Sequence, residues 1–582
     1  MLGSEVLVKM LTGYGVDTLF GVPGDTNVPL YTALDAAGDE IRHVMARDER
    51  GAGFMADAYA RVSNKVGVFE APSGAGAMYS LPPLAESNAS SVAVILFTID
   101  VPLICEGRGV ITELDCKTLF DPVSKASIQV KSAEKIPEIV RRAFRTATTG
   151  KPGAVHVVVP EDMLKAHVDP TQISLHVEEE CKTFPAIRSV APSDTLREIM
   201  TLLSQAERPL LVAGGGVNRS LAQPELLEFI DRFQVPVVST ITGQGAIEPN
   251  HPLEIGVIGD NGFHPHANKA LDESDLTIYL GSKVGSVVTI GWTFPSERAD
   301  RKIIQVDIDA DVLSNNTRNT LSVHGDVKAV LAELLKLDDI KHGDYADWVA
   351  EVNGWRRNFW INAEPMFEER TIPVRPEPVV KAFNDRIKGA VNILSDAGTP
   401  TPYMTRFLRL ADPGSRFIIP RAFGGLGYAI PAVVGAWAAE PDKRPIGLFG
   451  DGSLGMTAGE LETLVRLKCP ALLIHFNNAC FGWIKGLQRL DGYANDNCYS
   501  VDFDATKASA VAEAFGMKAW HVTNMDELET AMDEAFAFDG PCLIDIVVES
   551  LAERVPPVYS WLRKRGEDPL SNEAEVVLYS QA

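Results

Sequence analysis

The stretch Gly447–Gly482, GLFGDGSLGMTAGELETLVRLKCPALLIHFNNACFG, decides the fold of this chain. An apolar run ends in Gly-Asp-Gly-Ser, a segment with helically spaced apolar residues follows, and a second apolar run ends in Asn-Asn. This strand–helix–strand order predicts two neighbouring parallel strands. Parallel strands end at the same edge of a sheet, and open α/β sheets bind ligands outside that carboxyl edge. We therefore expect the residues that follow both strands to form one site.

Two side chains with ligand oxygens stand at these strand ends. Asp451 follows the first strand and Asn478 follows the second, and Mg²⁺ prefers such oxygens together with phosphate oxygens. Gly450 and Gly452 let backbone N–H groups approach a phosphate, and the N-terminus of the next helix adds partial positive charge. The pattern predicts a magnesium and diphosphate site, with an ordinary Asp-Gly turn and a plain loop start as the structural alternatives.

The same alternation of short β-branched runs and helical patterns extends over most of the chain. It predicts an α/β protein with three consecutive doubly wound parallel-sheet domains. We expect domains over residues 1–180, 195–345 and 379–550 and a C-terminal tail or lid over 551–582, with linkers at 181–194 and 364–378. The expected strands are Thr18–Phe20, Val66–Phe69, Ala93–Thr98, Ala154–Val159, Leu210–Ala213, Val235–Ser239, Leu276–Leu280, Ile303–Ile308, Ile418–Ile419, Pro445–Phe449, Ala471–Phe476 and Cys542–Val547, and the expected helices are Gly51–Arg61 and Asp344–Ala363.

Composition narrows the class of protein. The 582 residues are 46% hydrophobic and 23% charged, which is typical of a folded globular chain. Lys and Arg total 54 and Asp and Glu total 78, giving a net charge of −24 that disfavours nucleic acid as a partner. The longest apolar runs are far shorter than the ~20 residues of a membrane helix. Seven cysteines without CxxC spacing, and no visible export signal, favour the cytoplasm.

Four motifs together resemble one family of enzymes. They are FGVPGD at 20–25, ARDERGAGFMADAYAR at 46–61, GGLGYAIPAVVGA at 424–436, and GDGS at 450–453 followed by the Asn-Asn pair. The chain resembles the thiamine diphosphate (ThDP) enzymes of the acetolactate synthase and 2-oxo acid decarboxylase superfamily. The resemblance covers nearly the whole chain and implies pyrimidine-binding, central Rossmann-like and diphosphate-binding domains, with ThDP and Mg²⁺ as cofactors.

The resemblance also implies roles for single residues. Asp451, Asn478 and the carbonyl of Cys480 become the Mg²⁺ ligands. Leu426 matches the apolar residue that supports the bent cofactor, and the carbonyl of Gly424 matches the acceptor for its 4'-amino group. The remaining residues expected to contact the cofactor are Gly24, Ser73, Gly398, Thr399, Gly450, Gly452, Ser453, Phe481 and Gly482.

Glu49 is the expected catalytic residue. It precedes the small-residue helix GAGFMADAYA, where a carboxylate could also serve only to complement the helix dipole. In the family the matching Glu hydrogen-bonds N1' of the cofactor's pyrimidine and activates it. The resemblance implies that Glu49 faces the diphosphate site across a subunit interface. A homodimer is then the minimum active unit, and a homotetramer is the expected assembly.

Departures from the family's patterns bear on the substrate. Acetolactate synthases carry a Phe-Gln pair where this chain has Ile111-Thr112, next to Glu113, and a Trp where Leu487 aligns. Thr112, Glu113 and Leu487 are therefore the expected substrate residues of the pocket. The central segment Gly281–Trp292 lacks the charged cluster of the FAD-binding synthases, so FAD is not expected. The turn in Leu210–Val217, LLVAGGGV, either binds an adenine nucleotide such as ADP or is a plain tight turn.

The C-terminal segment Ser560–Asp568, SWLRKRGED, is basic in an acidic chain. Arg563 and Arg565 beside Trp561 and Tyr559 could clamp and stack a CoA-type nucleotide. This favours cleavage of a 2-hydroxyacyl-CoA into a ketone or aldehyde and formyl-CoA, as in the 2-hydroxyacyl-CoA lyase and oxalyl-CoA decarboxylase branch. The alternatives are an acetolactate synthase-like carboligase or decarboxylase of free 2-oxo acids and, more remotely, a non-catalytic nucleotide-binding regulatory protein.

Overall fold

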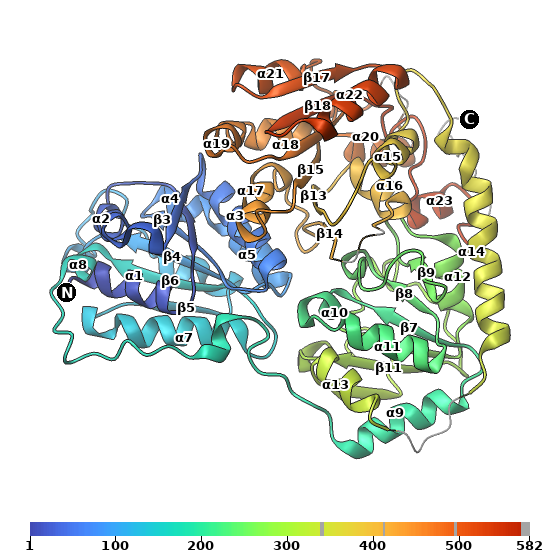
Figure 1. The fold of residues 1–582 in the computed structure, drawn as a ribbon, viewed down its shortest axis with the longest axis horizontal. Coiled ribbons are helices and arrows are strands. Elements are labelled where there is room, and N and C mark those ends of the chain that lie inside the picture. The colour runs from blue at the N-terminus through green and yellow to red at the C-terminus, as the bar shows by residue number, and fades with distance from the viewer. Residues whose placement is uncertain (338–342, 411, 413, 494–496, 572–582) are drawn as a thin grey trace.

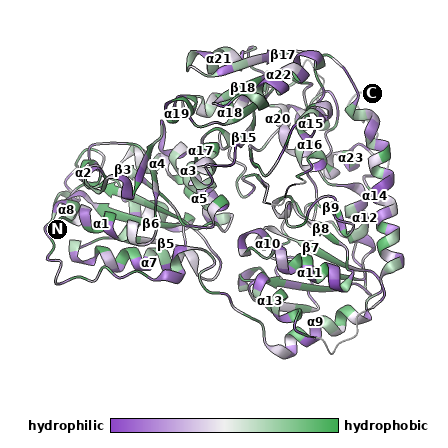
Figure 2. Ribbon diagram, in the orientation of Figure 1, coloured by the Kyte–Doolittle hydropathy of each residue, from purple (hydrophilic) through white to green (hydrophobic). Residues whose placement is uncertain are grey.

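The computed structural model describes residues 1–337, 343–410, 412, 414–493 and 497–571. It contains three six-stranded sheets in which every paired strand is parallel, with helices on their faces (Figure 1). The expected α/β class with three consecutive parallel-sheet domains is therefore confirmed. Hydrophobic residues gather in the strands and on the helix faces turned toward them (Figure 2). Among the described residues no helix combines the length and hydrophobicity that a membrane span needs.

The sheet of domain 1 has the order β2-β1-β3-β4-β6-β5. Its strands are β1 (Thr18–Gly21), β2 (Arg42–Met45), β3 (Gly67–Pro72), β4 (Val94–Asp100), β5 (Ala126–Gln129) and β6 (Val155–Pro160). Its helices are α1 (Gly3–Gly13), α2 (Val28–Ala37), α3 (Glu49–Ser63), α4 (Ala75–Tyr79), α5 (Leu81–Ala89), α6 (Cys116–Phe120), α7 (Ile136–Thr148) and α8 (Glu161–Lys165). The helix expected over Gly51–Arg61 lies inside α3.

The central sheet has the order β12-β11-β10-β7-β8-β9. Its strands are β7 (Pro209–Ala213), β8 (Val237–Ser239), β9 (Glu254–Val257), β10 (Leu276–Leu280), β11 (Lys302–Asp307) and β12 (Leu321–His324). Its helices are α9 (Ser193–Gln205), α10 (Gly215–Ser220), α11 (Gln223–Phe233), α12 (Pro265–Glu273) and α13 (Val327–Leu334), followed by the long α14 (Ala346–Phe367). Helix α14 continues past Glu364, where a linker was expected.

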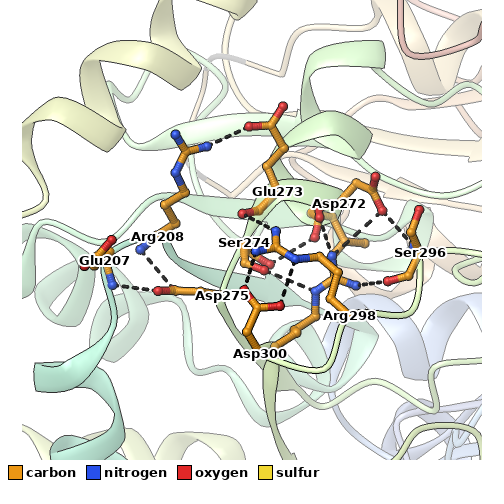
Figure 3. A network of polar contacts seen from close by, with 11 residues as sticks. Glu207, Arg208, Asp272, Glu273, Ser274, Asp275, Ser296, Arg298 and Asp300 are labelled. Atoms are coloured by element: carbon orange, nitrogen blue, oxygen red, sulfur yellow. Dashed lines mark hydrogen bonds and ion pairs between the residues drawn. The ribbon is translucent and has the colours of Figure 1, made fainter.

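A network of polar contacts connects three segments of this central domain (Figure 3). Asp275 accepts hydrogen bonds from the backbone N–H groups of Glu207 and Arg208, at 2.8 and 3.0 Å. Asp272 accepts one from the N–H of Ser296 at 2.7 Å. These contacts join the end of α12 to the segments before β7 and β11, so the network has a structural role.

The third sheet has the order β14-β13-β15-β16-β18-β17. Its strands are β13 (Asn392–Ser395), β14 (Arg416–Ile418), β15 (Pro445–Gly450), β16 (Leu472–Asn477), β17 (Lys518–Val522) and β18 (Cys542–Val547). Its helices are α15 (Pro376–Asn384), α16 (Pro400–Phe407), α17 (Ala429–Ala439), α18 (Asp451–Thr457), α19 (Glu460–Leu467), α20 (Gly482–Leu490), α21 (Ala508–Ala514) and α22 (Met525–Ala537), and α23 (Tyr559–Lys564) follows.

Helices α3 and α17 join domains 1 and 3 through a shared apolar core. A Cβ at Gly435 of α17 would lie 1.9 Å from the carbonyl oxygen of Met55 in α3, so the two backbones approach closely only because Gly435 has no side chain. The buried hydroxyl of Tyr428 donates to Asp57 at 2.8 Å, and Asp57 also accepts from Arg61 at 2.5 Å. The contact is both apolar and hydrogen-bonded, which fixes one domain against the other.

Candidate active site

Strands β15 and β16 are neighbours, and their ends bring Asp451 and Asn478 together. Gly450 pairs with Phe476 in the ladder, so the next residues of both strands leave the sheet side by side. The backbone N–H of Asn478 donates to Asp451 Oδ2 at 3.0 Å. The two side chains expected to share one cation thus meet across 27 residues of sequence.

Three oxygen atoms converge at this point. The side-chain Oδ1 of Asn478 lies 3.2 Å from Asp451 Oδ2 and 3.0 Å from the carbonyl oxygen of Cys480, and both of these are acceptors. Exchanging the amide oxygen and nitrogen of Asn478 would turn these contacts into hydrogen bonds. A cation between the oxygens would instead balance them as placed, and Mg²⁺ takes such oxygen ligands. The donor set therefore fits Mg²⁺.

The residues expected to contact the diphosphate lie on the loops around these oxygens. Thr399 Oγ1 lies 3.2 Å from the side-chain nitrogen of Asn478. Gly398 has φ +123°, which favours glycine, and a Cβ at Gly482 would lie 2.8 Å from Asn478 Nδ2 and 3.1 Å from Thr399 Oγ1. A Cβ at Gly452 would lie 2.6 Å from the ring of Phe481 and 3.2 Å from Leu426. Leu426 thus lies against the turn that follows β15, and its role toward the cofactor stays a prediction.

Buried hydrogen bonds hold these loops in place. Asp396 is fully buried and accepts from the N–H of Tyr428 at 2.7 Å. Burial raises the pKa of Asp396 to about 7, against the opposing effect of hydrogen bonds from Ser453 and from backbone N–H groups that include Gly427. Asp396, directly after β13, therefore ties the loop of Gly424 and Leu426 to the end of that strand.

A second network lies beneath Asp451. His475 of β16 is fully buried and hydrogen-bonds Asp545 at 2.9 Å, while its Nε2 lies 3.7 Å from Asp451 Oδ1. Burial would raise the pKa of Asp545, but hydrogen bonds from His475, Asn477 and His521 lower it to about 2. Sequence reasoning missed His475, although a lone histidine inside the apolar run ALLIHF was a visible signal.

Cys480 is no activated nucleophile. It is 4% exposed, and burial raises the pKa of its thiol. A reactive cysteine needs a lowered pKa. The chemical role that remains for this residue is that of its backbone carbonyl.

Glu49 begins α3 at the boundary of domains 1 and 3. Asp48 caps the helix by accepting from the N–H of Arg50, and Arg50 donates to the carbonyl of Met456 in domain 3 at 2.7 Å. Glu49 is 9% exposed. Burial, with smaller effects from Asp48 and Glu70, raises its pKa. A carboxyl with a raised pKa in a buried place is suited to exchange a proton with a bound group.

The loops next to Glu49 also carry expected site residues. A Cβ at Gly76 would lie 2.7 Å from Glu49 Oε1 and close to Pro72, and a Cβ at Gly24 would lie 2.5 Å from Pro72. Ser73 hydrogen-bonds Thr112 at 2.8 Å. Gly24, Glu49, Ser73 and Thr112 therefore share one region of domain 1.

Sequence reasoning also missed the buried Glu460 beside this region. Its carboxylate accepts from the N–H of Arg47 at 3.0 Å and from Thr463 at 2.7 Å. It also fills the space at Gly51, where a Cβ would lie 2.3 Å from Glu460 Oε1. Burial raises its pKa to about 7, although both hydrogen bonds lower it. Glu460 therefore joins domain 3 to the start of α3.

Glu113 stabilises its own loop. Its exposed carboxylate accepts from the N–H groups of Gly107, Gly109 and Val110, and the first of these hydrogen bonds is the largest cause of its lowered pKa. The structure therefore gives Glu113 a part in shaping the loop that presents Thr112, whose φ is +70°.

The expected stacking surface in the C-terminal segment is not available, so that expectation was wrong. Trp561 is 4% exposed and packs against Trp483 with ring centroids 4.7 Å apart, and Leu487 adjoins the same cluster. Tyr559 is 6% exposed and lies against Phe263. Both rings are occupied by the protein's own side chains. Arg563 and Arg565 are exposed at the end of α23.

The described part of the C-terminal tail, residues 551–571, contacts the rest of the protein. The N–H of Tyr559 donates to the carbonyl of Asp260, and Ser560 donates to the Asp260 carboxylate. Residues 572–582 of the expected tail or lid lie outside the described residues. The described part is attached to the central domain.

A cavity of about 310 Å³ lies at the glycine-rich turn after β7. Its lining includes Gly215, Gly216, the basic residues Lys283 and Arg421, and the acidic residue Asp309. This is the turn for which an adenine nucleotide was one of two interpretations. The volume falls within the range of small-molecule sites, and ADP there stays a prediction.

Family models identify all three domains. Residues 1–119 match the N-terminal TPP binding domain of thiamine pyrophosphate enzymes, residues 196–334 the central domain, and residues 396–546 the C-terminal TPP binding domain. The chain belongs to the thiamine pyrophosphate enzyme family. The family expected from the four motifs is thereby confirmed.

Curated relatives extend this result. A probable acetolactate synthase large subunit of Methanococcus aeolicus is 32% identical, covering 96% of this chain and 94% of the relative. The acetolactate synthase large subunit of Lactococcus lactis is 31% identical over the same shares of both chains. The isozyme 2 large subunit of Escherichia coli is 29% identical over 96% of this chain and 97% of its own. These relatives support the carboligase alternative and give the CoA-lyase interpretation no support.

Proposed function

We propose that this protein is a ThDP- and Mg²⁺-dependent carboligase of the acetolactate synthase type that joins 2-oxo acids. The observation that carries this proposal is the similarity to acetolactate synthase large subunits over 96% of the chain. The buried positions of Trp561 and Tyr559 agree with it, because they remove the aromatic surface on which the CoA interpretation relied.

The cofactor residues follow from the site. Asp451, Asn478 and the Cys480 carbonyl would hold Mg²⁺, and Gly452, Ser453 and Thr399 would contact the diphosphate. When bound, ThDP supplies an electron sink for breaking a bond next to a carbonyl. Leu426 would support the cofactor from the side of the turn after β15, where it meets Gly452.

Glu49 would hold the proton shared with the pyrimidine ring. Its raised pKa increases the fraction of the protonated carboxyl, which can donate a hydrogen bond from its oxygen to a ring nitrogen. Apolar walls around a carboxyl keep water away and strengthen such a contact. Thr112, held by Ser73, would face the substrate from the neighbouring loop.

We further propose that the enzyme works as a homodimer or a larger homo-oligomer. Segments that carry site residues also expose large apolar side chains: Ile111 is 87% exposed and Phe423, next to Gly424, is 68% exposed. A second copy of the chain would cover such surface. The predicted location of Glu49 opposite the partner's diphosphate site stays a prediction.

The experiment that tests the function uses the full chain with ThDP, Mg²⁺ and pyruvate, followed by detection of acetolactate. A parallel reaction supplies a short 2-hydroxyacyl-CoA and is analysed for formyl-CoA. Acetolactate without formyl-CoA supports the proposal. Formyl-CoA without acetolactate, or acetaldehyde as the only product from pyruvate, contradicts it. Glu49→Gln measured under the same conditions identifies background reactions.

A further inference from the structure

A cavity of about 710 Å³ lies between the central domain and the diphosphate domain. The edge strand β9, the long helix α14 and the end of α16 surround it (Figure 1). Two hydrogen bonds tie its walls together: Gln244 donates to the carbonyl of Thr405 at 3.0 Å, and Arg406 donates to the carbonyl of Phe263 at 2.8 Å. A volume of this size would hold a small organic molecule.

The walls carry four arginines. Arg356 donates to the backbone carbonyls of Pro249 and His251, so its hydrogen bonds lie to neutral groups. Arg409 lies over the ring of Trp360 at 3.9 Å. Arg406 is 8% exposed and stacks on Phe263 at 4.7 Å. Arg357 is the fourth and is exposed. Guanidinium groups anchored in this way keep their charge available to an anion.

Two buried donors in the cavity wall have no acceptor. His264 is 6% exposed, and its Nδ1 accepts from the N–H of Val257 at 2.9 Å. The proton of the neutral ring is therefore on Nε2, which has no hydrogen-bond partner. Nη2 of the buried Arg406 also has none. Both nitrogens have less than 1 Å² of exposed surface, so they would meet an acceptor in the cavity only after a small shift of their side chains.

Other groups in the wall refine the chemistry. Glu254 and Glu364 are the acidic residues of the lining, against four arginines. Glu364 is exposed, and burial raises the pKa of Glu254 to about 7, which reduces its negative charge near neutral pH. Trp360, with Arg409 on it, and Ile361 supply apolar and planar surface. The site is thus positively charged beside an apolar wall.

We propose that this cavity binds a small organic anion, one with phosphate or carboxylate groups attached to a planar or apolar part. Arginine forks pair with both kinds of group. The acidic groups would lie among Arg356, Arg406 and Arg409. The rest of the ligand would lie against Trp360.

This site is separate from the ThDP site. Helix α16 begins beside Thr399, which contacts Asn478, and its last turn places Thr405 and Arg406 in the cavity wall. At 1.5 Å per residue, its eight residues span about 12 Å. The proposal therefore does not depend on the carboligase function.

The test is calorimetric titration of the full chain, saturated with ThDP and Mg²⁺, with ADP in one arm and citrate in the other. These probes distinguish a phosphate source from a carboxylate source. The double variant Arg356→Gln with Arg409→Gln should weaken binding of the effective probe at least tenfold. The matched control Arg298→Gln removes a charge that is not part of the cavity lining. Arg298 pairs with Asp300 at 2.6 Å, and its replacement should leave binding within twofold.

A second measurement uses the unmodified chain. Phenylglyoxal modifies accessible arginines, and mass spectrometry locates the modified residues. The effective probe should protect Arg409 and Arg356 and should not protect Arg298. The proposal is overturned if neither probe binds, if the double variant folds and binds as tightly as the parent chain, or if a bound probe leaves both cavity arginines unprotected.

Discussion

At the scale of single residues, Glu49 is the group whose position matters most for the proposed chemistry. Its carboxylate lies against Gly76, and burial raises its pKa. Gln at this position has nearly the same shape but cannot exchange a proton. We expect Glu49→Gln to lower acetolactate formation by about 10²–10⁴-fold and to slow exchange of the C2 proton of bound ThDP, followed by NMR.

The control for that change is Glu40→Gln, which alters an exposed carboxylate outside the site. It should leave both the rate and the exchange unchanged. Unaltered proton exchange in the Glu49→Gln variant, with ThDP still bound, would contradict the assigned role.

Glu460 predicts a pH effect on stability. It is 1% exposed, and its pKa rises from 4.5 to about 7 on burial. The folded protein then binds a proton more tightly than the unfolded chain, so this group stabilises the fold below about pH 4.5. That contribution is lost as the pH rises through 7. A shift of this size corresponds to about 3 kcal/mol.

Glu460→Gln removes this titration. We expect the difference in urea midpoint between pH 5 and pH 8 to be smaller in the variant than in the parent chain. Equal differences in the two proteins would show that the pKa of Glu460 is the same in the folded and unfolded states.

At the scale of elements, the contact of α3 with α17 depends on Gly435. A Val side chain there would meet the backbone of Met55. Because backbone atoms cannot rotate away, the helices must separate, at a cost of about 1–3 kcal/mol or more. We expect Gly435→Val to lower the midpoint of chemical denaturation and to weaken ThDP binding. The measurements are tryptophan fluorescence in urea and calorimetry.

Gly354→Ala in α14 is the matched control, because a Cβ there meets no atom within 4 Å. Ala is favoured over Gly in a helix by about 1 kcal/mol. The midpoint should therefore stay or rise. A Gly435→Val protein as stable as the parent would mean that the two helices do not meet as described.

The strands show which elements sequence patterns can predict. The expected strands all occur, but β2, β5, β9, β12, β13 and β17 were missed. All of these except β13 lie at the edge of a sheet. Edge strands are partly exposed, as in Leu321–His324, where Val323 alone is buried. They lack the continuous apolar run that identifies a central strand. The short β13 was missed because Asn392 and Ser395 make it polar.

At the scale of the whole molecule, the predicted subunit arrangement can be tested by mixing two inactive variants. If Glu49 of one subunit serves the Asp451 site of its partner, a mixed dimer of Glu49→Gln and Asp451→Asn chains holds one intact site. We expect partial recovery of acetolactate formation after mixing, while each variant alone stays inactive. Size-exclusion chromatography with light scattering checks the oligomeric state.

No recovery, despite exchange of subunits shown with differently tagged chains, would place both residues of each site on one chain. That outcome would contradict the predicted interface. It would not affect the assignment of Glu49 to the site, because α3 also meets domain 3 within a single chain.

The motifs in Gly447–Gly482 were sufficient to predict the parallel sheet, a magnesium and diphosphate site and the meeting of Asp451 with Asn478. These features depend on local patterns: where an apolar strand ends, which residue follows it, and where glycine is required. The burial of Trp561 and Tyr559, the role of Glu460 and the arginine-lined cavity depend on contacts between segments far apart in the chain. Local patterns do not determine which distant surfaces meet, so only the folded structure could show that the expected CoA surface is interior and that a charged cavity lies between two domains.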